Sequence, residues 1–388
     1  MKITFFSNFF NDHQLSLCNA LYRQLGQYFV FAATEPMSDE RLQMGFEDIG
    51  RNYPYVEQLT GPDKFGRCLE LASSSDVAIV GSAPKNIVQK RLKEGKLTFY
   101  YSERMFRKGL WQILKPRTFF ELYRGIVSQN RQNLYVLCAG AYAAWDFNRL
   151  GVDRDHLFRW GYFPQTGSYD VGRLIESKTG PFDATLLWAG RLVPLKHPEL
   201  AVKCLSYLKS GGWRVRLDFV GSGEMETPLK EMCRDLGLED TVRFLGMMKP
   251  AGVRKAMENS DIFLFTSNKK EGWGAVLNEA MSCGCAVVAS SAAGASKFLI
   301  QQGENGFLYP DGDQKGLFHK AELLTGNRLK RRQVGAAACR TITELWNADI
   351  ASQRLIGLCD SLLAAKSVPF FERGPCSRAE ILRNPSVI

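Results

Sequence analysis

The stretch EGWGAVLNEAMSCGCAVVAS, residues 271–290, joins a short helical segment to the apolar run CAVVAS, which has the composition of a buried strand. The apolar residues between Glu271 and Glu279 would pack that helix against a sheet. Glycines flank Trp273 on both sides. An ordinary core helix requires neither these glycines nor the two carboxylates, so the stretch predicts a helix–strand unit that also carries a ligand site.

Apolar runs of strand length alternate with amphipathic stretches along the whole chain, a pattern that favours parallel sheets covered by helices. The runs in the first half are KITFFS, YFVFAA, VAIVGS, LTFYYS and LYVLCA. Those in the second half are ATLLWAG, VRLDFVG, TVRFLG, DIFLFT and CAVVAS. A polar, glycine-rich segment at 164–184 separates the halves. We therefore expect an α/β fold of two Rossmann-like domains with parallel sheets.

The two domains are expected at residues 1–170 and 171–365, and a polar tail at 366–388 is expected to be loosely held. A length of 388 residues is enough for two or three cores. No stretch has the pattern of a membrane span, and the N-terminal MKITFFSNFFND resembles a first strand rather than a signal peptide. Ten scattered cysteines without metal-site or disulfide spacing indicate reduced, cytosolic thiols.

Positive charge is concentrated in one segment of the chain. The formal net charge is +10, and residues 85–131 alone hold twelve Lys or Arg and three Glu, a net charge of +9. Aromatic residues lie among these bases. The segment suits anionic lipid headgroups, phosphate-bearing acceptors or nucleic acid, and it equally fits a solvated face over a buried one. The side chains expected to meet an anionic surface are Lys90, Arg91, Lys93 and Lys96.

A dinucleotide-binding function is excluded by the glycine pattern. That fold carries G-x-G-x-x-G after its first strand, where the glycines let the backbone approach a pyrophosphate. Here TFFSNFFNDHQ contains no glycine, and the nearest match, VGSGEMETP, lacks the third one. We therefore do not expect hydride transfer.

Three loops of the second half carry residues suited to chemistry. GRLVPLK follows one predicted strand, VGSGE follows the next, and EGWGAVLNE follows another. Because the carboxyl ends of parallel strands open into one crevice, the three loops should converge there. Cations and helix N–H groups suit a diphosphate, whereas carboxylates accept hydrogen bonds from ribose and sugar hydroxyls. The combination predicts a nucleotide-sugar site built without a metal ion.

The segments GRLVPLK, FVGSGE, VRFLG and EGWGAVLNEAMSCGCAVVAS resemble the retaining glycosyltransferases of glycosyltransferase family 4, whose GT-B fold has two domains facing across a cleft. The resemblance runs through residues 184–365. It includes the stretch LWNADIASQRLIGLCDSLL, which would form a final helix that packs back on the first domain. It implies that the first domain binds the acceptor and the second binds the nucleotide sugar.

The resemblance also implies roles for individual residues. Arg191 and Lys196 would hold the donor diphosphate and stabilise the charge on the departing nucleotide. Glu271 would contact sugar hydroxyls and Glu279 the ribose. The other donor-binding residues, which offer backbone groups or close approach, are Gly190, Gly221, Ser222, Gly223, Gly272, Trp273, Gly274, Ala275 and Val276.

The first half resembles the family less, because SNFFNDHQLSL replaces the glycine-rich loop common after the first strand. His13, at a predicted helix start, is the candidate for contact with sugar or acceptor, although a plain helix-terminal histidine fits equally. Further acceptor-side candidates follow a predicted strand: Ser102, Glu103, Arg104 and Lys108. Asp311 and Asp313 mimic a metal-binding Asp-x-Asp motif, but their setting in PDGD predicts a surface turn.

The sequence thus predicts a metal-independent, retaining glycosyltransferase of the hexosyltransferase type, acting in surface polysaccharide or glycolipid synthesis. The donor would be a nucleotide diphosphate sugar and the acceptor a glycan or lipid-linked molecule, with no cofactor and no nucleic-acid partner. The expected location is the cytoplasm, peripheral at the inner face of the cell membrane. The alternatives are another GT-B enzyme, such as a phosphorylase or an epimerase, and a non-catalytic scaffold that binds nucleotide sugar or membrane.

Overall fold

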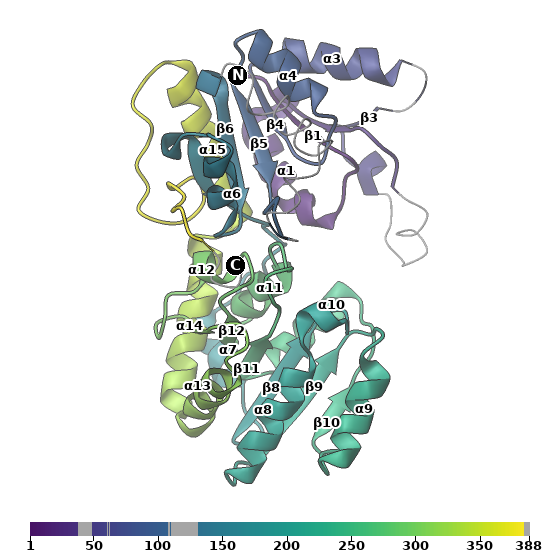
Figure 1. Cartoon of the computed structure of the whole chain (residues 1–388), viewed down its shortest axis with the longest axis vertical. Coiled ribbons are helices and arrows are strands. Elements are labelled where there is room, and N and C mark those ends of the chain that lie inside the picture. The colour runs from purple at the N-terminus through teal and green to yellow at the C-terminus, as the bar shows by residue number, and fades with distance from the viewer. Residues whose placement is uncertain (38–48, 60, 62, 108, 110–130, 384–388) are drawn as a thin grey trace. The chain divides into compact units, whose positions relative to one another are not determined.

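Two α/β units make up the structure, a computed structural model (Figure 1). It describes residues 1–37, 49–59, 61, 63–107, 109 and 131–383. Unit 1 comprises Met1–Gln165 together with Asn347–Arg383, and unit 2 comprises Thr166–Trp346. Each unit contains one parallel sheet, so the predicted α/β class is confirmed. The acceptor and donor roles of the two halves stay predictions.

Unit 1 is built around a seven-stranded parallel sheet with the order β3-β2-β1-β4-β5-β6-β7. Its strands are β1 (Ile3–Ser7), β2 (Phe29–Ala33), β3 (Val56–Gln58), β4 (Val77–Val80), β5 (Thr98–Ser102), β6 (Leu134–Ala139) and β7 (Leu157–Trp160). Its α-helices are α1 (Asp12–Leu25), α3 (Lys64–Ser74), α4 (Asn86–Lys93), α6 (Ala143–Arg149) and α15 (Ala348–Leu363). Single 3-10 turns are η1 (Gly26–Tyr28), η2 (Ile49–Asn52), η5 (Arg131–Asn133) and η6 (Arg154–His156).

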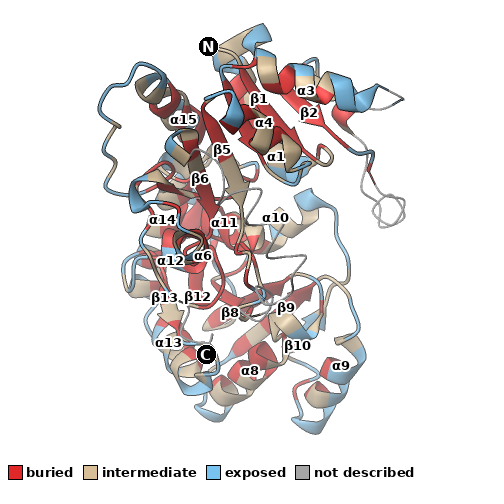
Figure 2. Ribbon diagram, turned by 45° about the horizontal axis from the view of Figure 1, so that its top comes forward, coloured by how far each residue is buried: buried red, intermediate tan, exposed pale blue. Residues whose placement is uncertain are grey.

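Most strand residues of unit 1 are buried, as Figure 2 shows, because helices cover the sheet, whereas β3 and the end of β5 are only partly buried. Phe6, Ala32 and Val80 belong to one core cluster with apolar residues of α3, α4 and α6. The last helix, α15, packs against α1. Gln24 Nε2 on α1 donates to Ser352 Oγ on α15 at 2.6 Å. The helix that we expected to pack back on the first domain is therefore part of unit 1.

The tail after α15 is held on the sheet as far as residue 379. The Arg159 amide donates to the Ser377 carbonyl at 2.7 Å, and the Ala379 amide donates to the Leu157 carbonyl at 2.9 Å. These bonds form an antiparallel bridge beside β7. Cys376 and Ser377 are buried. The expectation of a loosely held tail is wrong for this part, because β7 is an edge strand whose backbone groups need partners.

Unit 2 is built around a six-stranded parallel sheet with the order β10-β9-β8-β11-β12-β13. Its strands are β8 (Ala184–Ala189), β9 (Val215–Val220), β10 (Val242–Phe244), β11 (Ile262–Phe265), β12 (Ala286–Ser290) and β13 (Phe307–Tyr309). Its helices are α7 (Val171–Ser177), η7 (Pro194–Lys196), α8 (Glu199–Ser210), α9 (Glu226–Asp235), α10 (Pro250–Glu258), α11 (Ala275–Ser282), α12 (Ser296–Leu299), α13 (Gln314–Gly326) and α14 (Arg328–Glu344).

The strands β8, β11 and β12 are buried along their whole length. Continuous apolar runs are what a parallel sheet covered on both faces requires. Residues of α8, α9 and α13 pack with the central strands into one core cluster. All ten cysteines are free and buried, so they serve as small apolar fillers. Within the described ranges, no helix is long and apolar enough to cross a membrane.

Arg91, which we expected to contact an anionic surface, is wholly buried in unit 1. Its guanidinium donates to the carbonyls of Ser75 at 2.9 Å, Asp76 at 3.0 Å and Leu97 at 2.6 Å. It also donates to the Ala72 carbonyl and the Thr98 hydroxyl. The fork of donors therefore joins the end of α3 to the start of β5. Burial lowers the pKa of Arg91 to about 10.

Replacing Arg91 should destabilise the chain strongly. Arg91→Met removes the guanidinium from several buried carbonyls, and each buried polar group left without a partner costs about 1–3 kcal/mol. Lys90→Met is the matched control, because Lys90 forms an i,i+4 pair with Glu94 on the same helix. Such a pair contributes about 0.3–0.5 kcal/mol. Urea unfolding of both variants measures the contrast, and equal midpoints would show that the network is not structural.

Candidate functional site

Three loops of unit 2 meet at the carboxyl edge of its sheet. The loops begin at Gly190, Gly221 and Thr266, directly after β8, β9 and β11. In the sheet β8 lies between β9 and β11, and the strand order reverses between β8 and β11. Ligands of doubly wound sheets bind at such a switch point, outside the carboxyl ends of the strands. The sequence-predicted convergence of the three motifs is therefore present within unit 2.

The Gly-Ser-Gly turn after β9 packs backbone to backbone against the loop after β8. A Cβ atom on Gly221 would lie 1.9 Å from the Gly190 carbonyl oxygen. The Leu192 amide donates to the Ser222 carbonyl at 2.9 Å, and the Met225 amide returns a bond to the Leu192 carbonyl at 2.9 Å. Glycine at 221 is therefore required by packing alone. Its predicted contact with the donor stays a prediction.

Lys196 and Glu271, predicted to bind different parts of the donor, contact each other. Lys196 Nζ lies 2.5 Å from Glu271 Oε2, and the two side chains are only 13% and 16% exposed. Ser267 Oγ donates to the same carboxylate oxygen at 3.1 Å. Arg191, by contrast, is exposed and has no partner among the described residues. Arg191 is therefore the cation left available to an anion, while Lys196 is neutralised by Glu271.

Further bonds between the loops were not visible in the sequence. Trp188 Nε1 on β8 donates to Thr266 Oγ1 at 2.9 Å, and Thr266 Oγ1 donates to the Lys196 carbonyl at 2.6 Å. The Asn268 amide donates to the Leu195 carbonyl at 3.0 Å. The His197 imidazole is bonded to Asn268. Each of these bonds joins loops that follow different strands. A local sequence pattern therefore cannot predict them.

The helix α11 begins without a side-chain cap. Its N-cap is Gly274, whose φ of +91° lies in the left-handed region, and no side chain accepts its first amides. A Cβ atom on Gly274 would lie 2.4 Å from the Phe265 ring. Glu271 does not cap this helix, because it lies ahead of the helix and pairs with Lys196. A helix start without a cap is suited to an anion.

The Trp273 side chain belongs to the core. It is 1% exposed, its Nε1 donates to Asn278 Oδ1 at 2.8 Å, and its ring packs against Phe298 and Trp346. The indole anchors the loop ahead of α11 to the interior of unit 2. Any donor contact by this residue would therefore use its backbone.

Glu279 lies just over one turn into α11. The carboxylate is half-buried and accepts no hydrogen bond from the described part of the chain. Burial raises its pKa, and the charge of Arg254 on α10 opposes that shift. A desolvated carboxylate without a hydrogen-bond donor is costly for the fold and suits a ligand hydroxyl.

In unit 1, predicted acceptor residues gather at the carboxyl edge of the sheet. The His13 ring stacks on Tyr162 with centroids 5.8 Å apart and planes at 13°. Tyr162 Oη donates to Glu103 Oε1 at 2.8 Å, and Arg107 pairs with Glu103 Oε2 at 2.8 Å. The Tyr101 ring meets Tyr162 edge-on. Sequence reasoning named His13 and Glu103 but missed Tyr162, which follows a strand that it did not predict.

The other acceptor candidates of unit 1 are placed differently. Arg104 is 8% exposed and lies 3.6 Å from the buried Asp146, so its guanidinium is inside unit 1, and its contact with an acceptor stays a prediction. Ser102 Oγ donates to the Glu103 carbonyl at 2.8 Å. Lys108 lies outside the described residues. Burial, and the bond to Glu103, raise the pKa of Tyr162, so the phenol is a neutral donor.

The Asp-x-Asp turn has a structural role. Asp313 is the N-cap of α13, where its Oδ1 accepts the Gly316 amide at 2.8 Å. Asp311 lies in the turn ahead of it. In the described ranges, no three His, Cys, Asp or Glu side chains lie close enough together to hold a metal ion.

The fold is that of the GT-B glycosyltransferases. HepE from Anabaena, solved in complex with UDP, superposes with a TM-score of 0.68 at 19% identity, covering 93% of this chain and 100% of that one. The lipopolysaccharide outer core galactosyltransferase WaaB gives 0.64 at 16% identity, covering 94% and 99%. At these identities the likeness establishes the fold alone.

Sequence comparisons agree on the second unit. Residues 176–341 match the family model of glycosyl transferases group 1. The phosphatidyl-myo-inositol mannosyltransferase of Mycobacterium leprae is 34% identical over 170 residues, 44% of each chain. The amylovoran biosynthesis glycosyltransferase AmsK of Erwinia amylovora is 29% identical over 182 residues, 46% of this chain and 44% of that one. The matched region thus spans less than half the length of each of these two relatives.

Glu279→Gln should stabilise the chain at neutral pH. When the pKa of a carboxyl is higher in the folded chain than in the unfolded chain, its contribution to the free energy of unfolding is lost as pH rises through the folded-state pKa. The amide of Gln carries no charge, so it has no such desolvation cost. The variant should therefore melt at a higher temperature than the parent at pH 7.5, and the gain should shrink as pH falls toward 4.5. Glu231→Gln, at an exposed position on α9, is the control and should change little. A lower melting temperature at pH 7.5 would contradict the placement of Glu279.

Proposed function

We propose that this protein transfers a sugar from a nucleotide diphosphate sugar to an acceptor hydroxyl, with retention at the anomeric carbon and without a metal ion or other cofactor. One observation carries the proposal. At the switch point of unit 2 a free guanidinium, an ammonium–carboxylate pair, an uncapped helix start and a hydrogen-bond-deficient carboxylate share one sheet edge. This edge lies in the segment that matches glycosyl transferases group 1.

Each part of the donor would be bound by the groups whose charge and hydrogen-bonding capacity complement it. The exposed Arg191 and the first amides of α11 suit the diphosphate. Lys196 and Glu271 together suit the boundary between phosphate and sugar, because one donates to an anion and the other accepts from hydroxyls. Glu279 suits the ribose. HepE was solved in complex with UDP, and a relative from Corynebacterium glutamicum is a GDP-mannose-dependent mannosyltransferase, so uridine and guanosine nucleotides are both candidates here.

In the proposed reaction, the acceptor oxygen attacks the anomeric carbon from the same face as that from which the leaving group departs. The bond between the anomeric carbon and the phosphate oxygen breaks, the bond to the acceptor oxygen forms, and the acceptor proton goes to the departing phosphate oxygen. Arg191 and Lys196 would stabilise the charge that develops on that phosphate. Glu271, held by Lys196 and Ser267, would orient the sugar through its hydroxyls.

The acceptor would bind unit 1 at the stack of His13 and Tyr162. An aromatic face packs against the apolar face of a sugar ring, and Glu103 beside it accepts hydrogen bonds from hydroxyls. Relatives named for mannosyl transfer to phosphatidylinositol and for amylovoran synthesis support a glycan or lipid-linked acceptor.

A thermal-shift panel tests the donor side. UDP, GDP, UDP-glucose and GDP-mannose are offered singly in EDTA, since a ligand at 100 times its Kd adds about 2.7 kcal/mol to stability. We expect one base to be preferred, followed by release of nucleotide when an acceptor is added. Binding without transfer would favour the scaffold alternative. Conversion of donor without any acceptor would favour an epimerase.

Two glutamate variants should separate donor binding from turnover. Glu279→Ala should weaken binding of the free nucleotide diphosphate by about 10- to 150-fold, the range for one hydrogen bond to a charged group. Glu271→Gln should not weaken that binding, because it releases Lys196 to meet the phosphate, but it should lower kcat by a similar factor. Calorimetric titration and a transfer assay measure the two effects. If both variants bind and turn over like the parent, the glutamates are structural.

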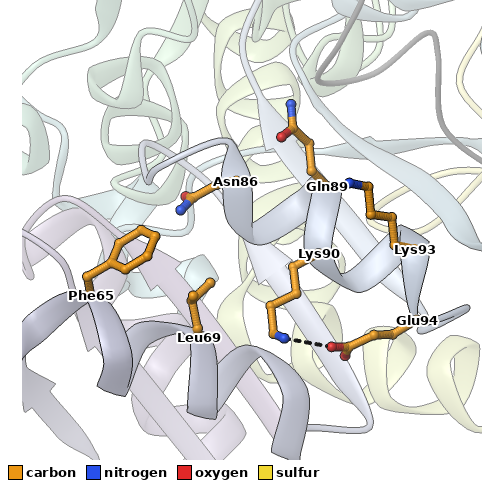
Figure 3. Close-up of a pocket in the computed structure, with 7 residues that line it drawn as sticks. All are labelled: Phe65, Leu69, Asn86, Gln89, Lys90, Lys93 and Glu94. Atoms are coloured by element: carbon orange, nitrogen blue, oxygen red, sulfur yellow. Dashed lines mark ion pairs between the residues drawn. The ribbon is translucent and has the colours of Figure 1, made fainter.

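The proposed acceptor side includes an anionic membrane at the cytoplasmic face. Of the bases assigned to this contact, Arg91 is buried and Lys96 Nζ donates to the Ser73 carbonyl. Lys93 and Lys90 remain, and Lys90 also pairs with Glu94. They line a groove of about 400 Å³ between α3 and α4, together with Leu69 and the 59% exposed Phe65 (Figure 3). An exposed aromatic beside lysines supports contact with anionic headgroups.

Charge reversal in this groove should release the protein from anionic vesicles. Each basic side chain near such a surface contributes about 1 kcal/mol, so Lys90→Glu with Lys93→Glu should reduce binding by at least 30-fold. Lys230→Glu with Lys255→Glu is the control, because it reverses two exposed lysines of unit 2 that also pair along their helices. Co-sedimentation with phosphatidylglycerol and phosphatidylcholine vesicles is the measurement. Equal binding to both lipids, or to neither, would leave the groove without this role.

A further inference from the structure

His197 occupies an unusual backbone position between the two loops of the donor site. It follows Lys196 directly and ends the 3-10 turn η7 with φ +47°. Among the described residues of unit 2, it is the one non-glycine residue with positive φ. A side chain disfavours that conformation, so the contacts of this imidazole must offset its cost.

The hydrogen bonds around His197 define its protonation. Its Nδ1 lies 2.8 Å from Glu199 Oε1, and its Nε2 lies 3.0 Å from Asn268 Nδ2. Asn268 Oδ1 already accepts the Lys270 amide at 2.9 Å, which fixes the orientation of the amide group. Asn268 Nδ2 must therefore donate, and Nε2 must accept. This pattern fits the neutral imidazole, with its proton on Nδ1 and donated to Glu199.

The same asparagine sets the position of Glu271. The Asn268 amide donates to the Leu195 carbonyl, and the Asn268 carbonyl accepts the Glu271 amide, each at 3.0 Å. Asn268 therefore begins the turn that carries Glu271, and His197 holds its side chain from the Lys196 loop. An imidazolium would present an N–H to Asn268 Nδ2, and two donors cannot bond.

We propose that His197 is a positioning residue of the sugar-transfer reaction, whose neutral imidazole holds the turn bearing Glu271 in register with Lys196 and whose protonation releases that turn. The inference rests on the proposed function. It adds a residue that touches neither donor nor acceptor, and it makes turnover sensitive to pH through geometry rather than through proton transfer to the substrate.

The charges that face His197 come from several elements. Glu199 belongs to α8 and Asp311 to the turn after β13; the hydrogen bond to Glu199, opposed by burial and reinforced by Asp311, raises the pKa of His197. The nearby cations are Lys196, neutralised by Glu271, Lys203 on α8, and the exposed Lys270. As pH falls through the raised pKa, the pair with Glu199 strengthens while the bond to Asn268 breaks. The fold is therefore kept and the turn is released, so kcat should fall as pH falls through that pKa.

Three variants separate positioning from folding. His197→Gly removes the imidazole and relieves the positive φ, so the chain should stay folded and bind UDP or GDP normally while kcat falls about 3- to 10-fold, the value of one hydrogen bond. His197→Gln keeps a neutral donor and acceptor but cannot titrate, so it should recover part of kcat and abolish the acid-side loss. Asp311→Asn should move that loss to lower pH.

The readouts are kcat and KM against pH with UDP-glucose and GDP-mannose, and 15N NMR of the four histidines. The His197 signal is assigned as the one that is absent from the spectrum of His197→Gln. We expect the Nδ1–H tautomer at high pH. An Nε2–H tautomer, an unchanged kcat in His197→Gly, or the same acid-side loss in His197→Gln would overturn the proposal. If no donor is turned over while the tautomer and titration are as expected, the proposed function fails and the placement of His197 stands.

Discussion

The ion pair between Lys196 and Glu271 joins the two loops on which the candidate site of unit 2 depends. It connects the loop after β8 to the loop after β11, the two strands between which the sheet order reverses. Both side chains are mostly buried, and removing one partner of such a pair costs about 3–5 kcal/mol. Each charge is therefore held in place by the other. A cation and an acceptor-only carboxylate are fixed side by side, an arrangement that matches the boundary between a phosphate and a sugar.

The fold of both units follows from the apolar runs of the sequence, with informative exceptions. Each predicted run forms a strand, and most of these strands bury four or more of their residues, as a parallel sheet covered by helices requires. The strands β3, β7 and β13 were missed. β3 contains no fully buried residue, and β13 is three residues long, so their pairing is decided by neighbouring strands and not by their own composition.

The candidate site could be predicted in its residue types but not in its partners. A strand end followed by Arg and Lys, or by two glutamates, is a local pattern that sequence reveals. The pairing of Lys196 with Glu271 depends on the sheet order and is not local. Charge counting fails for a related reason: Arg91 and Arg104 add to the net charge of the basic segment, but both are buried. The carbonyl partners of Arg91 leave no trace in side-chain composition.

The features that lower the stability of unit 2 lie at the carboxyl edge of its sheet. Glu279 is a half-buried carboxylate without a hydrogen-bond donor among the described residues, and His197 holds a backbone conformation that side chains disfavour. Locally unfavourable side-chain environments and backbone conformations of this kind are expected at functional sites. The cost at Glu279 would be relieved by a ligand hydroxyl that donates to its carboxylate. Because binding of that ligand returns the energy that the fold has given up, the carboxylate that lowers the stability of unit 2 would add to the affinity for the ligand.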